Sequence, residues 1–178
     1  MTEITPLASL DFLPYLNPLG LLPDHLDGRV GVYAIFDAGQ TLQFIGYSRN
    51  VYLSLKQHLV RQPHQCHWLK VQIIDRPSRT LLEQIRETWM AENGGVPVGN
   101  GVELEAWNQP IDVKTQMTEA ERSVYAAAVD ELAQVKALKT VARRVEADLL
   151  AVLRDRGVTE PMRFNPKMKE GGLLDLLC

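Results

Sequence analysis

The sequence lacks several features that would place it in a class at once. Only two of its 178 residues are cysteine, Cys66 and Cys178, and they lie too far apart to indicate a disulfide framework or a paired-cysteine metal knuckle. The formal net charge of −3, with a pI near 5.8, argues against strong sequence-independent binding of a phosphate backbone, which needs clustered Lys and Arg. We therefore expect reduced thiols and a cytoplasmic location.

We also expect no membrane-spanning or secretory segment. Residues 7–26 are apolar, but Glu3 stands where a signal peptide would carry positive charge. Four prolines interrupt every possible helix in this part of the chain: Pro6, Pro14, Pro18 and Pro23. We expect residues 1–29 to form an apolar, proline-rich strap across a domain surface, and we expect no membrane partner.

Composition and charge indicate one domain with an extension. Hydrophobic residues make up 46% of the chain, enough for one proper core at this length. Residues 1–113 contain 8 basic and 12 acidic side chains, whereas residues 134–178 contain 9 basic and 6 acidic ones. The basic end is the tail, and the prolines and glycines of residues 158–178 indicate little regular structure there.

Strand and helix signals alternate through residues 30–108. Apolar and β-branched runs at 29–36 and 42–46, joined by turn residues, predict an antiparallel hairpin, and residues 68–74 predict a third strand. Helices are predicted from Ser48 or Asn50 to about residue 60, and from Ser78 to residue 93. The fold class is therefore α/β, with a small three-stranded antiparallel sheet flanked by helices.

Residues 117–157 predict a long C-terminal helical extension. The segment from Met117 to Arg156 contains no Gly or Pro, opens with a capping box at Thr118 and Glu121, and has apolar residues at helical spacing. One helix of this length would extend beyond a small domain. It either breaks, within residues 136–144, or meets a protein partner or a second copy of the chain.

Two short motifs resemble the paired strands of the GIY-YIG nuclease superfamily. Gly31-Val32-Tyr33 matches the first strand, and Phe44-Ile45-Gly46 matches the second with phenylalanine in place of tyrosine. The order of hairpin, helix, strand and helix agrees as well, so the resemblance covers about residues 30–100. It implies a GIY-YIG-like sheet domain.

The resemblance also implies a set of site residues. Four positions keep the residue of that family: Tyr33, His58, Glu83 and Asn100. Two positions lose it: Phe44 replaces the second tyrosine and Ser54 replaces an arginine. In the family, the first tyrosine is the water-activating base and the glutamate is the ligand of Mg²⁺. The resemblance therefore makes Glu83 the metal ligand of an active enzyme.

The lost arginine decides between two versions of this function. Removing a preorganised positive group from a phosphoryl-transfer site costs about 10² to 10³ in rate. The resemblance thus implies a degenerate nuclease-like domain with catalysis lost or weakened, which binds nucleic acid or protein. The alternatives are an active Mg²⁺-dependent endonuclease that cuts DNA, and a protein-binding adaptor without a role in nucleic acid.

A loop before the third strand offers a different chemistry. His64, Cys66 and His67 could join His58 as zinc ligands, but no second cluster supplies the usual paired spacing. Loop polarity is the simpler interpretation of this group.

Overall fold

The structure is a computed structural model that describes residues 2–177, so Cys178 lies outside the described residues. The chain divides into two compact units. The first comprises Met1–Asn108 with Val158–Glu160, and the second comprises Gln109–Gly157 with Pro161–Cys178. Across the described residues, no helix has the length and apolar character needed to cross a membrane.

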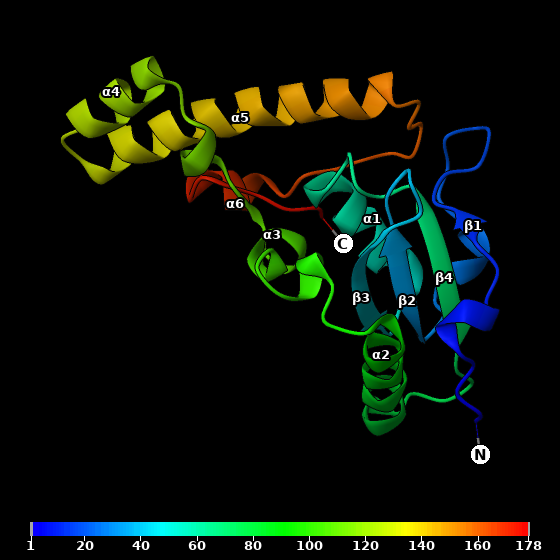
Figure 1. The fold of residues 1–178 in the computed structure, drawn as a ribbon. Helices are drawn as coiled ribbons and strands as arrows, with labels where there is room; N and C mark the ends of the chain where they lie inside the picture. The colour runs from blue at the N-terminus through cyan, green and yellow to red at the C-terminus, as the bar shows by residue number, and fades with distance from the viewer. Residues whose placement is uncertain (1, 178) are drawn as a thin grey trace. The chain divides into compact units, whose positions relative to one another are not determined.

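A four-stranded antiparallel sheet forms the centre of the first unit (Figure 1). Its strands follow the order β1-β4-β2-β3, with bounds β1 Leu13–Pro14, β2 Gly31–Phe36, β3 Leu42–Ser48 and β4 Trp68–Ile73. The antiparallel sheet with flanking helices confirms the α/β class, but the expected count of three strands is wrong. The additional strand is β1, which the N-terminal segment adds beside β4. Pro14 fits there because an edge strand can spare an N–H group.

Strand β2 lies between β3 and β4, and all six of its residues are buried. Tyr33 is opposite Gly46 on β3 and Val71 on β4. Because side chains alternate along a strand, Val32 and Ala34 point to one face of the sheet and Tyr33 to the other. Other elements must therefore pack on both faces of the sheet to bury these side chains.

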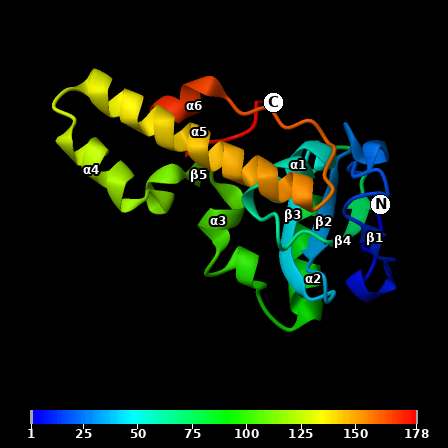
Figure 2. The ribbon, with the colours of Figure 1, turned by 90° about the horizontal axis from the view of Figure 1, so that it is seen from above.

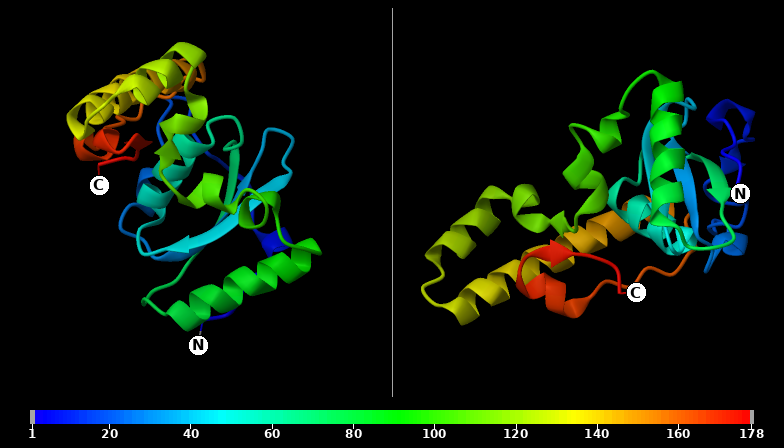
Figure 3. Two further views of the ribbon diagram at one scale, coloured as in Figure 1. Left: turned by 90° about the vertical axis from the view of Figure 1, so that its left-hand side faces the viewer. Right: turned by 90° about the horizontal axis from the view of Figure 1, so that it is seen from below.

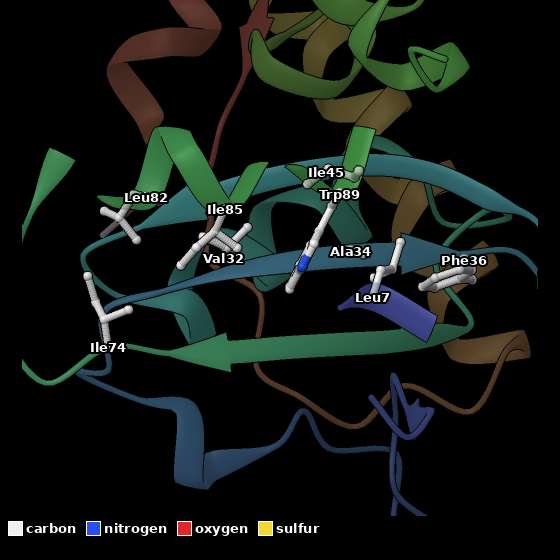
Figure 4. Close-up of a cluster of buried hydrophobic side chains, with 9 residues drawn as sticks. All are labelled: Leu7, Val32, Ala34, Phe36, Ile45, Ile74, Leu82, Ile85 and Trp89. Carbon is white, nitrogen blue, oxygen red and sulfur yellow. The ribbon is translucent and has the colours of Figure 1, made fainter. Parts of the chain in front are cut away.

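Helix α2, Arg79–Asn93, covers the Val32 face (Figures 3 and 4). Its buried side chains Leu82, Ile85 and Trp89 join Val32 and Ala34 in one hydrophobic cluster. Its ends follow the sequence signals. Ser78 accepts a hydrogen bond from a backbone N–H of the first turn, and Gly94 closes the helix with a φ of 83°.

Helix α1, Val51–Arg61, and the short helix α3, Leu104–Asn108, belong to the other face, where Tyr33 lies. Asn50 caps α1 by accepting a hydrogen bond from Leu53 N at 3.3 Å. The predicted helices after residue 50 and after Ser78 are thus confirmed. Between α2 and α3 the chain forms a 3-10 turn, Val98–Asn100.

The N-terminal segment runs beside β4 and is held by side chains from the sheet and from α2 (Figure 1). It contains two 3-10 turns, Leu7–Ser9 and Asp24–Leu26. Glu92 accepts hydrogen bonds from the backbone N–H groups of Leu7 and Ala8, at 2.9 and 2.7 Å. The buried Lys70 donates to the carbonyl oxygen of Leu7 at 3.1 Å, and its ammonium lies 4.4 Å from the ring centre of Phe12. The cation is thereby satisfied without a carboxylate.

The second unit contains an antiparallel helical hairpin (Figure 2). Helix α4 spans Glu119–Ala127 and α5 spans Glu131–Asp155. The expected long helix is therefore broken, which was one of the two predicted alternatives. The break lies at residues 128–130, so its predicted position within residues 136–144 is wrong. The side chain of Asp130 explains the position, because it accepts a hydrogen bond from Ala133 N at 2.7 Å and starts a new helix.

Short elements complete the second unit. They are β5 Ile111–Asp112, the 3-10 turn Val113–Gln116, α6 Pro166–Glu170 and β6 Leu173–Leu174. Strands β5 and β6 pair in antiparallel fashion. The tail, for which the sequence indicates little regular structure, thus contains a one-turn helix and a short strand.

The cluster under α2 gives a stability prediction. Ile85 is fully buried, so Ile85→Ala is expected to lower the free energy of unfolding by about 2 to 5 kcal/mol through lost burial and a residual cavity. Urea titration followed by circular dichroism measures this. Val102 is 92% exposed, so Val102→Ala should stay within about 0.5 kcal/mol of the parent protein. Equal losses in the two variants would contradict the assigned core.

Candidate functional site

Tyr33 and His58 form a buried polar pair at the centre of the first unit. Tyr33 comes from β2 and His58 from α1, and Tyr33 Oη lies 2.8 Å from His58 Nε2 in a shared hydrogen bond. Both side chains are almost completely buried, with 3% and 4% of their surface exposed. Gly46 makes room for them, because a Cβ atom at this position would lie 2.7 Å from Tyr33 Oη. The last residue of the Phe44-Ile45-Gly46 motif is therefore a steric requirement of the pair.

Two aromatic rings close this pair from the side. Phe44 lies 4.6 Å from His58 between ring centres, and Trp107 of α3 stacks on Phe44 at 5.2 Å with parallel planes. The fully buried Trp107 is held by Arg61, whose guanidinium donates to its carbonyl oxygen at 3.2 Å. Gly99 allows this approach, since a Cβ atom there would meet the indole nitrogen at 2.8 Å.

Sequence reasoning missed Arg61 and Trp107. Arg61 could have been found, because it lies three residues after His58 and seven after Ser54, and so shares their face of the helix. Trp107 follows the last motif residue by seven positions in a segment without periodicity, and only the folded chain shows that it reaches Phe44.

Ser54 and Asn100 lie beside the cluster, and Ser54 bonds to side chains whereas Asn100 bonds to the backbone. Ser54 Oγ donates to Ser48 Oγ at 2.7 Å, and Ser54 also forms a hydrogen bond with Tyr33. Asn100 pairs with the backbone of Ile45 in both directions: its Oδ1 accepts from Ile45 N at 2.8 Å, and its Nδ2 donates to Ile45 O at 2.7 Å. The amide thus imitates a neighbouring strand at the outer edge of β3.

Glu83 is not part of this arrangement. Helix α2 covers the Val32 face of the sheet, so Glu83 and Tyr33 lie on opposite sides of β2. Glu83 accepts hydrogen bonds from Arg79 Nε at 2.8 Å and from Tyr47 Oη at 3.2 Å, and the bond from Arg79 keeps the pKa of its carboxyl below the usual range. The structure therefore brings four of the six expected site residues to one face, places Asn100 at the edge of β3 and leaves the expected metal ligand on the other face.

The electrostatics of the cluster keep its rings neutral. Burial raises the pKa of Tyr33 far above its ordinary value, against a smaller lowering by the hydrogen bond with Ser54. Burial, assisted by the positive charge of Arg61, lowers the pKa of His58 to about 3. Tyrosine and imidazole are then both uncharged at neutral pH. A closed, neutral cluster of this kind supports the fold more readily than it supports catalysis.

The structure offers no set of ligands for the Mg²⁺ or zinc sites that the sequence suggested. Among the described residues, no group of three or more His, Cys, Asp or Glu side chains is placed to hold a metal ion. Glu83 would offer Mg²⁺ one carboxylate that is already bonded to Arg79 and Tyr47. In the loop before β4, the thiol of Cys66 is fully buried and donates to the carbonyl oxygen of His58, with Sγ 3.6 Å away.

Comparison with known proteins gives one relative of note. No family model matches the chain. The chain is 34% identical over 103 residues to a protein of Arabidopsis thaliana named bifunctional monothiol glutaredoxin-S16, chloroplastic. The similarity covers 56% of this chain but only 31% of that relative. The chain thus spans about a third of the length of the relative that it matches.

This finding corrects the family and function that were expected from the two motifs. The relative is named as a glutaredoxin and not as a nuclease, so the comparison contradicts the identification with the GIY-YIG superfamily. The degenerate nuclease-like module, the active endonuclease, the adaptor alternative, the DNA partner and the magnesium cofactor are withdrawn with it. The place of Glu83 across the sheet from Tyr33 agrees with this correction.

The buried histidine predicts how stability depends on pH. The pKa of His58 is about 3 in the folded chain, whereas an unfolded histidine has a pKa of about 6.5. As the pH falls below about 6.5, the unfolded chain binds the proton first, so the free energy of unfolding should fall by up to about 1.4 kcal/mol per pH unit until the pH approaches 3. Above that range His58 contributes no slope.

Urea titrations between these pH values measure the slope. In the variant His58→Gln, the slope of the unfolding free energy against pH should be smaller by the contribution of about one proton. His64 is exposed in the loop, so His64→Gln should keep the slope of the parent protein. A parental slope in His58→Gln would contradict a neutral, buried His58.

Proposed function

We propose that this chain acts in thiol redox chemistry as a module that accompanies a glutaredoxin-type thiol centre. The observation that carries the proposal is the identity of 34% over 103 residues with a bifunctional monothiol glutaredoxin. The matched part is 31% of that relative, so the activity of the whole relative comes to this chain only as a proposal. Its printed name assigns it more than one function, which fits a relative with a part beyond its thiol centre.

The burial of Cys66 supports the accompanying role. Thiol exchange needs a thiolate that a disulfide can approach, and its rate depends on both the ionisation and the exposure of the thiol. Cys66 has no exposed surface, and its thiol donates to the carbonyl oxygen of His58. In the proposal, the reactive thiol is provided by a separate domain or chain.

The residues expected at the site receive a supporting role in this proposal. Tyr33, Phe44, Ser54 and His58 fix helix α1 to the sheet, and Asn100 completes the edge of β3. The cytoplasmic location stays a prediction, because the relative's printed name places that protein in the chloroplast.

Thiol labelling tests the role of Cys66. In the variant Cys178→Ser, which leaves one cysteine, an aromatic disulfide reagent should label the native chain at least about 100-fold more slowly than the chain in concentrated guanidinium chloride, because labelling requires local opening. A double variant that also carries Cys66→Ser gives the background. Labelling of Cys66 at equal rates in native and unfolded chain would show that its thiol is available for exchange.

A second experiment tests the accompanying role itself. A monothiol glutaredoxin is titrated with the full chain, and its glutathione-dependent reduction of a mixed disulfide is recorded beside calorimetric binding. We expect saturable binding and a changed rate, and the variant Cys66→Ser should behave as the parent does. Absence of binding, or activity of the chain alone that Cys66→Ser abolishes, would overturn the proposal.

A further inference from the structure

The helical hairpin of the second unit carries an apolar groove. The groove has a volume of about 590 Å³, and small side chains form most of its floor: Ala120, Ala127, Ala133 and Ala137. Helix α4 contributes one wall and has no buried residue, although it is well capped by Thr118 and Glu121. Its Val124, which lines the groove, is 63% exposed. Helix α4 contacts α5, yet none of its residues is buried, and an exposed apolar surface of this kind often marks an interaction site.

Bulky apolar side chains lie at the tip of the same hairpin. Val129 lies in the turn between α4 and α5 and is 94% exposed, and Leu132 lies in the first turn of α5 and is 80% exposed. An alanine floor leaves space that branched side chains of this size can fill. The hairpin therefore carries both a receiving surface and the side chains that fit it.

The groove and the tip of the hairpin also carry side chains of opposite charge. Glu121 at the groove is already neutralised by Arg144 of its own chain, with N–O distances of 2.8 and 2.9 Å. Lys136, which also lines the groove, forms no ion pair among the described residues. The acidic Glu131 at the tip is exposed and likewise forms none. One hairpin thus offers an unpaired cation at its groove and an unpaired anion at its tip.

We propose that this hairpin is a homodimerisation surface whose occupant is a second copy of the chain. In a two-fold contact, each residue that meets a partner residue is met by it in return, so one surface must hold both complementary parts. Leu132 of each copy enters the alanine groove of the other, and Glu131 of each copy faces Lys136 of the other. This pairing buries the exposed face of α4 and satisfies both lone charges.

The mass of the full chain in solution tests the proposal. Light scattering from about 5 to about 500 µM brackets the affinity expected for a small interface. We expect the mass to rise with concentration from 20.0 kDa toward twice that value. Leu132→Asp should weaken dimerisation by at least about 30-fold, because it places a charge in an apolar contact. Val102→Asp is the matched control, since Val102 is at least as exposed as Leu132 but belongs to the first unit, and it should dimerise as the parent does.

Charge exchange tests the pairing directly. Lys136→Glu and Glu131→Lys should each weaken dimerisation, because like charges then face each other, and the double variant should recover most of the loss. Circular dichroism confirms that each variant keeps its helices. A mass that stays at one chain up to 500 µM, or a Leu132→Asp variant that dimerises as well as Val102→Asp, would overturn the proposal. A double variant no better than the weaker single variant would overturn the pairing of Glu131 with Lys136.

Discussion

The burial of strand β2 on both faces is the constraint on which the first unit depends. A strand whose six residues are all buried needs a cover above and below, and each cover must come from a different part of the chain. Helix α2 packs on the Val32 side, while α1 and α3 cover the Tyr33 side. The alternation of side chains along β2 therefore decides which residues can meet at all.

Polar groups enter this interior only with partners. Tyr33 shares its hydrogen bond with His58, Asn100 satisfies both backbone groups of Ile45, and the ammonium of Lys70 rests on a carbonyl oxygen and an aromatic ring. Each pairing replaces contacts with water; Gly46 leaves room for the tyrosine of the first pair, and the ring of Phe12 lies against the ammonium of the last. These buried groups are well ordered but closed to solvent and to substrates. For this reason the proposed thiol chemistry takes place outside the buried cluster of this chain.

Sequence signals correctly predicted the helix starts that are stabilised by interactions between residues close together in the chain. Asn50, Ser78 and Thr118 each cap a helix by bonding to a backbone N–H three residues further along, so the local order of residues was sufficient to place these helix starts. The same reasoning failed where distant segments decide. Strand β1 exists only because β4 offers a free edge, and Glu83 resembles a site residue in its spacing while the sheet separates it from Tyr33. A motif records the order of residues along the chain and not the face to which each side chain points.

The contacts of the N-terminal segment have a consequence for synthesis on the ribosome. Leu7 is synthesised before the side chains that hold it, because these come from Lys70 and Glu92, which are 63 and 85 residues further along. At typical translation rates of about 5 to 20 residues per second, the segment waits roughly 4 to 17 seconds for its last anchor. During this interval its leucines and prolines are open to solvent and to chaperones. A segment that is made before the residues that anchor it is thus among the last parts of the sheet to find its place.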